Sequence, residues 1–91
     1  MVTAIILICA NRTEINQTAQ TLASVPGISE VYSVSGNYDL IAIARVTSND
    51  ALSELITDRL LKIDSILKTE TMLAFKAYSR HDLESLFSIG E

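Results

Sequence analysis

The 91-residue chain contains one cysteine, one histidine and no tryptophan. A single thiol cannot form a disulfide within the chain, and it cannot complete a zinc site alone. His81 has only Asp82 as a neighbouring ligand group in the sequence, and no nucleophile is paired with a base. We therefore expect no metal and no cofactor. We expect Cys9, which lies in an apolar stretch, to be a buried and inert thiol.

Positive charge is scarce as well. Seven Lys and Arg residues are scattered among eleven Asp and Glu residues, which gives a net charge of −4. Because nonspecific nucleic-acid binding depends on clustered Lys and Arg, we expect no direct DNA binding. An RNA-binding sheet is also disfavoured, because the run that begins at Tyr38 carries no further aromatic side chain on which a base could stack.

Long hydrophobic runs are absent. The apolar stretch Ala4–Ala10 is far shorter than the ~20 residues that a membrane helix needs. It also lacks the positively charged start of a signal peptide. These features indicate a cytoplasmic protein without membrane contact. A single domain of this size has a small core, so oligomerisation is a natural source of extra stability.

The apolar periodicities predict six elements around a central hairpin. The expected order is strand, helix, strand, strand, helix, strand, over Val2–Cys9, Thr13–Ser24, Ile28–Ser35, Tyr38–Val46, Ser48–Leu61 and Ile66–Tyr78. Gly36 and Asn37 are expected to form a tight turn between the two central strands, because both residues tolerate positive φ. Right-handed crossovers then give an α+β, ferredoxin-like βαββαβ fold, a four-stranded antiparallel sheet with two helices on one face.

The helix boundaries have local signals. Thr13 is expected to cap the first helix, whose inward face would carry Ile15, Ala19, Leu22 and Ala23. We expect residues 1–78 to form the domain. The tail 79–91 would form a short helix that docks on the oligomer, because Leu83, Leu86, Phe87 and Ile89 would otherwise face water.

Two strands are apolar on both faces. Val2–Cys9 and Leu40–Val46 show no polar alternation, so both sides of the sheet should be covered. Two helices can cover only one side. An apolar surface of that breadth is rare on a soluble monomer, and a two-fold dimer that packs sheet against sheet would bury it.

Two segments carry a family resemblance. The hairpin Val-Ser-Gly-Asn-Tyr-Asp-Leu (34–40) and the strand start Lys-Thr-Glu-Thr-Met-Leu (68–73), with this order of elements, resemble the effector-sensing (RAM) domain of the Lrp/AsnC family. The resemblance covers residues 1–78. Full regulators also carry an N-terminal helix-turn-helix, whereas here the first strand begins at once. The resemblance therefore implies a stand-alone sensing domain.

What the family does gives further expectations. Its domains dimerise through their sheets, and the dimers assemble into rings that bind effectors, commonly amino acids, at contacts between dimers. The resemblance places the ligand site on the central hairpin and the last strand, at Gly36, Asn37, Tyr38, Asp39, Thr69, Thr71 and Met72. Asp39 would accept the ammonium group of the effector. The expected function is a regulatory module, not an enzyme.

Two alternatives stay open. An enzyme of the dimeric α+β barrel type would use the same topology, but it would need polar groups inside a sheet-lined cavity. A pure interaction partner would form mixed rings with full-length Lrp/AsnC regulators and alter their DNA binding. The sequence does not separate this second alternative from an independent sensor.

Overall fold

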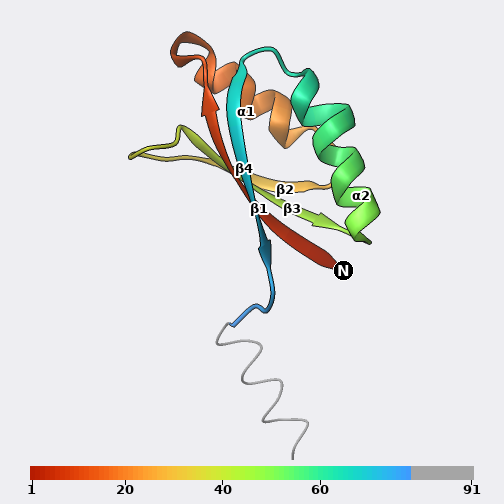
Figure 1. Cartoon of the computed structure of the whole chain (residues 1–91). Helices are drawn as coiled ribbons and strands as arrows, with labels where there is room; N and C mark the ends of the chain where they lie inside the picture. Colours follow the sequence, from red (N-terminus) through yellow and green to blue (C-terminus); the bar gives the residue numbers. More distant parts are fainter. Residues whose placement is uncertain (79–91) are drawn as a thin grey trace, which may run out of the picture.

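The structure, a computed structural model, describes residues 1–78 of the chain. Its elements in chain order are β1 (Val2–Ala10), a 3₁₀ turn (Arg12–Glu14), α1 (Ile15–Ala23), β2 (Ile28–Ser33), β3 (Leu40–Val46), α2 (Asn49–Glu54), a π-helical turn (Leu55–Arg59), a second 3₁₀ turn (Leu60–Lys62) and β4 (Ile66–Ala74). The strands form one antiparallel sheet in the order β2-β3-β1-β4. Both helices lie on the same side of it (Figure 1). This arrangement confirms the predicted ferredoxin-like fold.

The core lies between the sheet and the helices. Successive strand residues point to opposite faces, so every second residue of β1 and β3 faces the helices. These strand residues are fully buried or nearly so, as are one apolar residue of α1 and three of the second helical segment. The apolar core residues are Ala4, Ile6, Ile8, Ala10, Leu40, Ala42, Ala44, Leu22, Leu52, Leu55 and Leu60. The helices are thus held to the sheet by aliphatic packing.

The first helix differs from its sequence prediction at both ends. A 3₁₀ turn precedes it, and no side chain caps either the turn or the helix, so the predicted cap by Thr13 is wrong. Ala23, predicted to face inward, is exposed, because the helix presents Thr18 and Leu22 to the sheet instead. The Thr18 hydroxyl donates to Glu14 O at 2.7 Å and lies 2.5 Å from Ser65 Oγ. This buried polar contact ties α1 to the turn before β4.

The second helical segment begins where the sequence predicts. The Ser48 side chain accepts a hydrogen bond from the Ala51 N–H at 3.1 Å, which caps α2. Its interior is not a uniform α-helix, however. The backbone widens into the π-helical turn Leu55–Arg59 and then tightens into a 3₁₀ turn. A periodicity of apolar residues does not distinguish these forms, because all three keep Leu52, Leu55 and Leu60 on the buried face.

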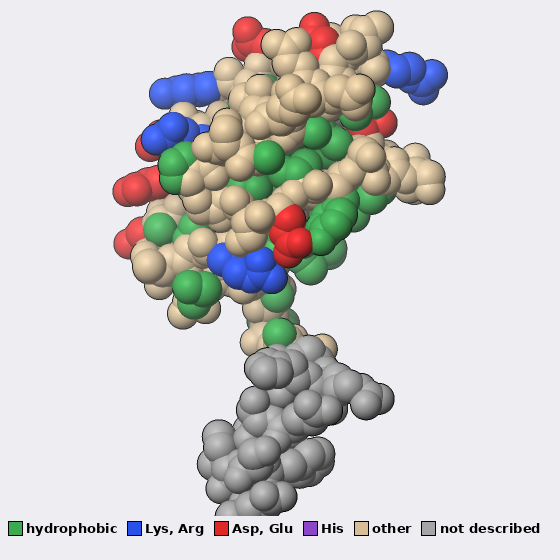
Figure 2. Space-filling model, turned by 180° about the vertical axis from the view of Figure 1, so that it is seen from behind, with side chains coloured by type: hydrophobic (Ala, Val, Ile, Leu, Met, Phe, Trp, Pro, Cys, Tyr) green, Lys and Arg blue, Asp and Glu red, His purple; other side chains and the backbone are tan. Residues whose placement is uncertain are grey.

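Among residues 1–78, no helix lies over the other side of the sheet. The side chains there come from the alternate residues of the strands, and Ile5 is paired with both Ile43 and Met72. We call this surface the open face; its apolar members are Ile5, Leu7, Cys9, Tyr32, Ile41, Ile43 and Met72. These strand pairings confirm the predicted second apolar face. From the side opposite to Figure 1, hydrophobic side chains are visible among uncharged polar ones, and an acidic and a basic side chain lie close together in the lower half of the molecule (Figure 2).

The last strand is shorter than predicted. Strand β4 ends at Ala74 instead of continuing to Tyr78, because β1, its pairing partner, ends at that point with Thr3 opposite Ala74. Phe75 is 99% exposed and Tyr78 is 76% exposed. The predicted tail 79–91 lies outside the described residues. Within residues 1–78, no helix has the length and apolar character needed to cross a membrane.

Candidate functional site

The loop between β2 and β3 protrudes from one end of the sheet (Figure 1). It is longer than the predicted two-residue turn, because the two strands stop pairing at Ser33 and Leu40 and leave residues 34–39 between them. The Val34 N–H donates to Asp39 O at 3.0 Å and closes this loop. Gly36 has a φ of +108°, whereas Asn37 does not share the positive φ of a tight turn. Gly36 thus supplies the one left-handed residue that the loop needs.

Asp39 fixes the base of the loop to β1. Its backbone N–H donates to Ile8 O at 2.9 Å, and its carboxylate accepts from the Ala10 N–H at 2.8 Å. The side chain thereby satisfies a backbone donor beyond the last β1–β3 pair, Ile8 with Leu40. One carboxylate oxygen of Asp39 therefore has a structural partner within the chain.

Tyr38 links the loop to β4. Its hydroxyl donates to Glu70 Oε2 at 2.5 Å, which joins two residues 32 positions apart. The hydrogen bond to the Glu70 carboxylate raises the pKa of Tyr38, with smaller contributions from burial and the negative charge nearby. Since Glu70 is paired with Leu7, this contact lies on the open face. The predicted meeting of hairpin and last strand is thus realised through Glu70.

Asn37 and Cys9 meet at the same corner. The Cys9 thiol donates to Asn37 O at a distance of 3.6 Å, and Cys9 is partly exposed rather than buried as predicted. The reason is that Cys9 belongs to the open face, next to Lys68 on β4. Within residues 1–78, no three His, Cys, Asp or Glu side chains lie close enough to hold a metal ion. We call Cys9, Asn37, Tyr38 and Glu70 the corner site.

The predicted residues of β4 are divided between the two faces of the sheet. Thr69 and Thr71 are paired with Ile8 and Ile6, which point toward the helices, so both threonines lie on the helix side. Met72 is paired with Ile5 and lies on the open face, where it is 44% exposed. The fold therefore brings Met72, but neither threonine, to the face that holds Tyr38.

Glu70 is the residue of this corner that sequence reasoning missed. It shares a face with Met72 because the two are separated by one residue in a strand. The signal was present in the alternation of β4, since it places a carboxylate on the same face as Met72 and opposite the apolar residues of β1. The family motif points to the threonines on either side of Glu70, and these lie on the opposite face.

The sequence model of the Lrp/AsnC ligand binding domain matches residues 3–83 of the chain. The chain belongs to the Lrp/AsnC family. The match spans the whole sheet and both helices, so the loop and the corner site lie within a ligand-binding domain of this family.

Two solved structures resemble this Lrp/AsnC domain closely. The protein TTHA0845 from Thermus thermophilus is 38% identical with a TM-score of 0.82, over 88% of this chain and 100% of its own. The protein PHS023 from Pyrococcus horikoshii is 32% identical with a TM-score of 0.80, over 89% and 98%. Each of these similarities covers nearly the full length of the solved protein. The similarity therefore comes from this domain and from no additional one.

Curated relatives of this Lrp/AsnC domain are longer. The HTH-type transcriptional regulator PYRAB16920 of Pyrococcus abyssi is 30% identical over 59 residues, which is 65% of this chain and 39% of that protein. The match therefore covers less than half the length of that relative. That relative is named as a transcriptional regulator, and the part that this chain matches is the ligand-binding domain of the family.

Proposed function

We propose that the chain is an effector-sensing module that binds an amino acid and works as an oligomer. The observation that carries this proposal is the open face of a ligand-binding domain, with an apolar centre and a polar corner where the loop meets β4. Ligand would shift the equilibrium between assembly states, because it binds one of them more tightly than the other.

Assembly is the first part of the proposal. Ile5, Leu7 and Ile43 lie at the centre of the open face, on the two middle strands of the sheet. Two copies that pack these faces together would remove the apolar side chains from water, at a gain of roughly 25 cal/mol per Å². Such dimers would then associate further into a ring, as is expected for this family.

The assembly is tested by Ile5→Asp, with Ser53→Asp on the exposed side of α2 as the control. Light scattering at micromolar concentration should give a dimer or a larger multiple for the wild type and the control. The Ile5→Asp protein should remain folded by circular dichroism but have the mass of a monomer, because each interface would bury an unpaired charge. A wild type that is monomeric at all accessible concentrations would contradict the proposal.

The effector site is the second part. We place it at the loop and the corner site, with Gly36, Asn37, Tyr38, Asp39 and Met72 around it. Glu70 is better placed than Asp39 to hold the ammonium group, because it is exposed and lies on the open face beside Tyr38. Asp39 already accepts the Ala10 N–H and therefore serves mainly to hold the loop. Thr69 and Thr71, on the other face, could contribute only to a site completed by a neighbouring subunit.

Calorimetry tests this assignment of roles. A thermal-shift screen of the free amino acids selects the ligand, since binding to the folded state raises stability. Glu70→Gln should weaken its binding by roughly tenfold to a hundredfold, the usual loss for a charged hydrogen-bond partner. Asp39→Asn should have a much smaller effect. A larger loss of affinity in Asp39→Asn than in Glu70→Gln would assign the ammonium contact to Asp39. Equal affinities in both variants would show that the site lies elsewhere.

A second candidate function is suggested by the length of the curated relatives. PYRAB16920 is named as an HTH-type regulator, and this chain matches 39% of it. We propose as the alternative that the open face pairs with the same face of a full-length regulator and forms a mixed assembly. Absence of heat from every amino acid, together with co-purification of this chain with a tagged Lrp/AsnC regulator, would favour this alternative.

A further inference from the structure

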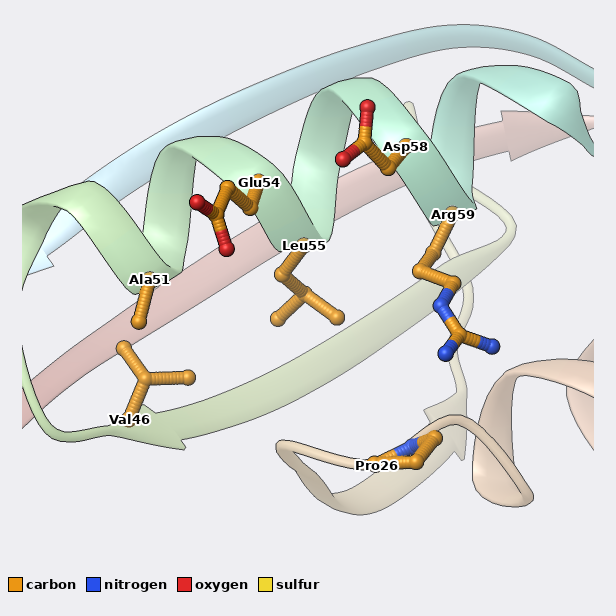
Figure 3. A pocket seen from close by; sticks show the side chains of 7 residues that line it. All are labelled: Pro26, Val46, Ala51, Glu54, Leu55, Asp58 and Arg59. Atoms are coloured by element: carbon orange, nitrogen blue, oxygen red, sulfur yellow. The ribbon is translucent and has the colours of Figure 1, made fainter.

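A pocket of about 300 Å³ lies on the helix side of the sheet, away from the corner site. Val46, Leu55 and Pro26 provide its apolar floor, with Ala51 at one end. Leu55 and Arg59 extend into the space between the helix and Pro26. Glu54 and Asp58 line the pocket from the same helix, one helical turn apart, and the Asp58 carboxylate is turned away from Pro26 (Figure 3). The pocket thus combines an aliphatic floor with two carboxylates and a guanidinium.

The floor of this pocket is held in place by the backbone. Gly27, next to Pro26, has a φ of +99°, and its carbonyl accepts from the Arg45 N–H at 2.8 Å. A Cβ on Gly27 would lie 3.2 Å from Val46 Cγ1 and 3.5 Å from Leu55 Cδ2, so the loop packs tightly behind the floor. The pocket therefore exists before any ligand arrives, which lowers the ordering cost of binding.

The π-helical turn sets the positions of the polar groups. It spans Leu55–Arg59, so three of the residues that line the pocket belong to it. Such turns are frequently found at functional sites. The ion pair found within residues 1–78 joins Arg45 to Glu30, so Glu54, Asp58 and Arg59 are not neutralised by one another. Their charges are therefore available to a ligand.

We propose that this pocket binds a short aliphatic zwitterion, a ligand with an ammonium group and a carboxylate joined by a few carbons. Glu54 and Asp58 would accept the ammonium group, and Arg59 would donate to the carboxylate. The carbon chain would lie on Val46, Leu55 and Pro26. The volume is at the lower end of the range for small-molecule pockets, about 300–1,000 Å³, which excludes ligands as large as a nucleotide. This site is independent of the effector site.

Methyl-labelled protein provides the test, because the floor contains Val46 and Leu55. Titration of the full chain with 5-aminopentanoate should shift the methyl signals of these two residues, with a dissociation constant in the millimolar range, since the charged groups are exposed. Pentylamine lacks the carboxylate and should bind more weakly. Pentanoate, which lacks the ammonium group, should bind least because the pocket has one net negative charge.

Variants identify the contacts. Glu54→Gln and Asp58→Asn should each weaken binding of 5-aminopentanoate by about twofold to fivefold, as expected for exposed charge pairs. Arg59→Gln should remove the preference for 5-aminopentanoate over pentylamine. Asp50→Asn, in the first turn of α2 and outside the pocket, is the control and should leave binding unchanged. Equal responses to all three probes, unchanged binding in all three variants, or shifts confined to the loop 34–39 would overturn the proposal.

Discussion

The two faces of the sheet are built from neighbouring residues of the same strands, yet their surroundings differ. Ile6 is fully buried beneath the helices, while Ile5, the preceding residue, is partly exposed on the open face. Both are isoleucines in the middle of β1, so hydrophobicity does not distinguish them. An apolar pattern therefore shows that a sheet face must be buried. The topology decides whether helices of the same chain bury it.

Polar groups also differ between the faces. On the helix side, the buried Thr18 hydroxyl is satisfied within the chain by Glu14 O and Ser65 Oγ. On the open face, hydrogen-bonded carboxylates stand at the margins, where Glu70 accepts from Tyr38 and Glu30 accepts from Tyr32. Arg45 adds an ion pair to Glu30 at 3.4 Å. An apolar centre with a polar rim is typical of a protein–protein interface.

The largest expected effect is the difference in stability between the same substitution on the two faces of the sheet. Ile6→Asp should unfold the protein, because an unpaired carboxylate in the core costs several kcal/mol out of a total stability of ~5–15 kcal/mol. Ile5→Asp, its matched control, should stay folded at 25 °C, because its carboxylate would lie on the open face instead of in the core. Circular dichroism at 25 °C and during heating measures both. A folded Ile6→Asp protein would show that the helices cover the sheet less tightly than the burial of Ile6 indicates.

The next effect concerns the junction of the loop with β1. Asp39→Ala should lower the free energy of unfolding by about 1–3 kcal/mol, because the Ala10 N–H loses its acceptor. For a domain of this size, each kcal/mol corresponds to a fall in Tm of roughly 4–8 °C. Asp39→Asn retains a side-chain oxygen and should lose much less. Equal losses in the two variants would mean that the charge, and not the hydrogen bond, stabilises the loop.

A smaller loss is expected on the helix side at Thr18. Thr18→Val keeps the shape of the side chain but leaves Ser65 Oγ without its partner, at a cost of about 1–2 kcal/mol. Thr21→Val is the comparison, because the Thr21 hydroxyl is exposed and bonds only to Gln17 O. Urea denaturation should distinguish them, with the Thr21 variant within ~0.5 kcal/mol of the wild type. If both variants behave alike, the contact to Ser65 contributes nothing measurable.

The smallest expected effect concerns the hydrogen bond between Tyr38 and Glu70 at the margin of the open face. The hydrogen bond to Glu70 raises the pKa of Tyr38 above its ordinary value of 10.0. Its contribution to stability is therefore complete below pH 10 and is lost as the pH rises through the higher folded-state pKa. Tyr38→Phe should remove this part of the alkaline decline in Tm. Tyr32, whose pKa is raised mainly by its hydrogen bond to Glu30, should still contribute to the alkaline decline in Tm of the Tyr38→Phe variant. Identical pH profiles for wild type and Tyr38→Phe would contradict the linkage.

The fold was predictable because its signals are local and repeated. The apolar periodicities mark the strands and the second helical segment, and Gly36 marks the central loop. The two apolar faces were also predictable from β1 and β3. The family match and the sheet order confirm these inferences.

The corner site was predictable only in part. That the hairpin and the last strand contribute to one site was implied by the family resemblance, but the pairing register decides which residues meet. Register places Glu70 beside Tyr38 and directs Thr69 to the other face. The bond from the Ala10 N–H to Asp39 depends on where β1–β3 pairing stops, and no pattern of residue types specifies that point. The roles proposed for the site residues stay predictions.

The strand order has a consequence for how the chain folds during its synthesis. Strand β1 is made first but occupies an interior position of the sheet, between β3 and β4, with Thr3 opposite Ala74. It can pair with β3 once residue 46 has been made, but its edge toward β4 stays unpaired until residue 74 has left the ribosome. Contacts so distant in sequence slow folding, and an unpaired apolar strand is prone to aggregate. Nascent chains that stop before β4 should therefore depend on chaperones more than the finished protein does.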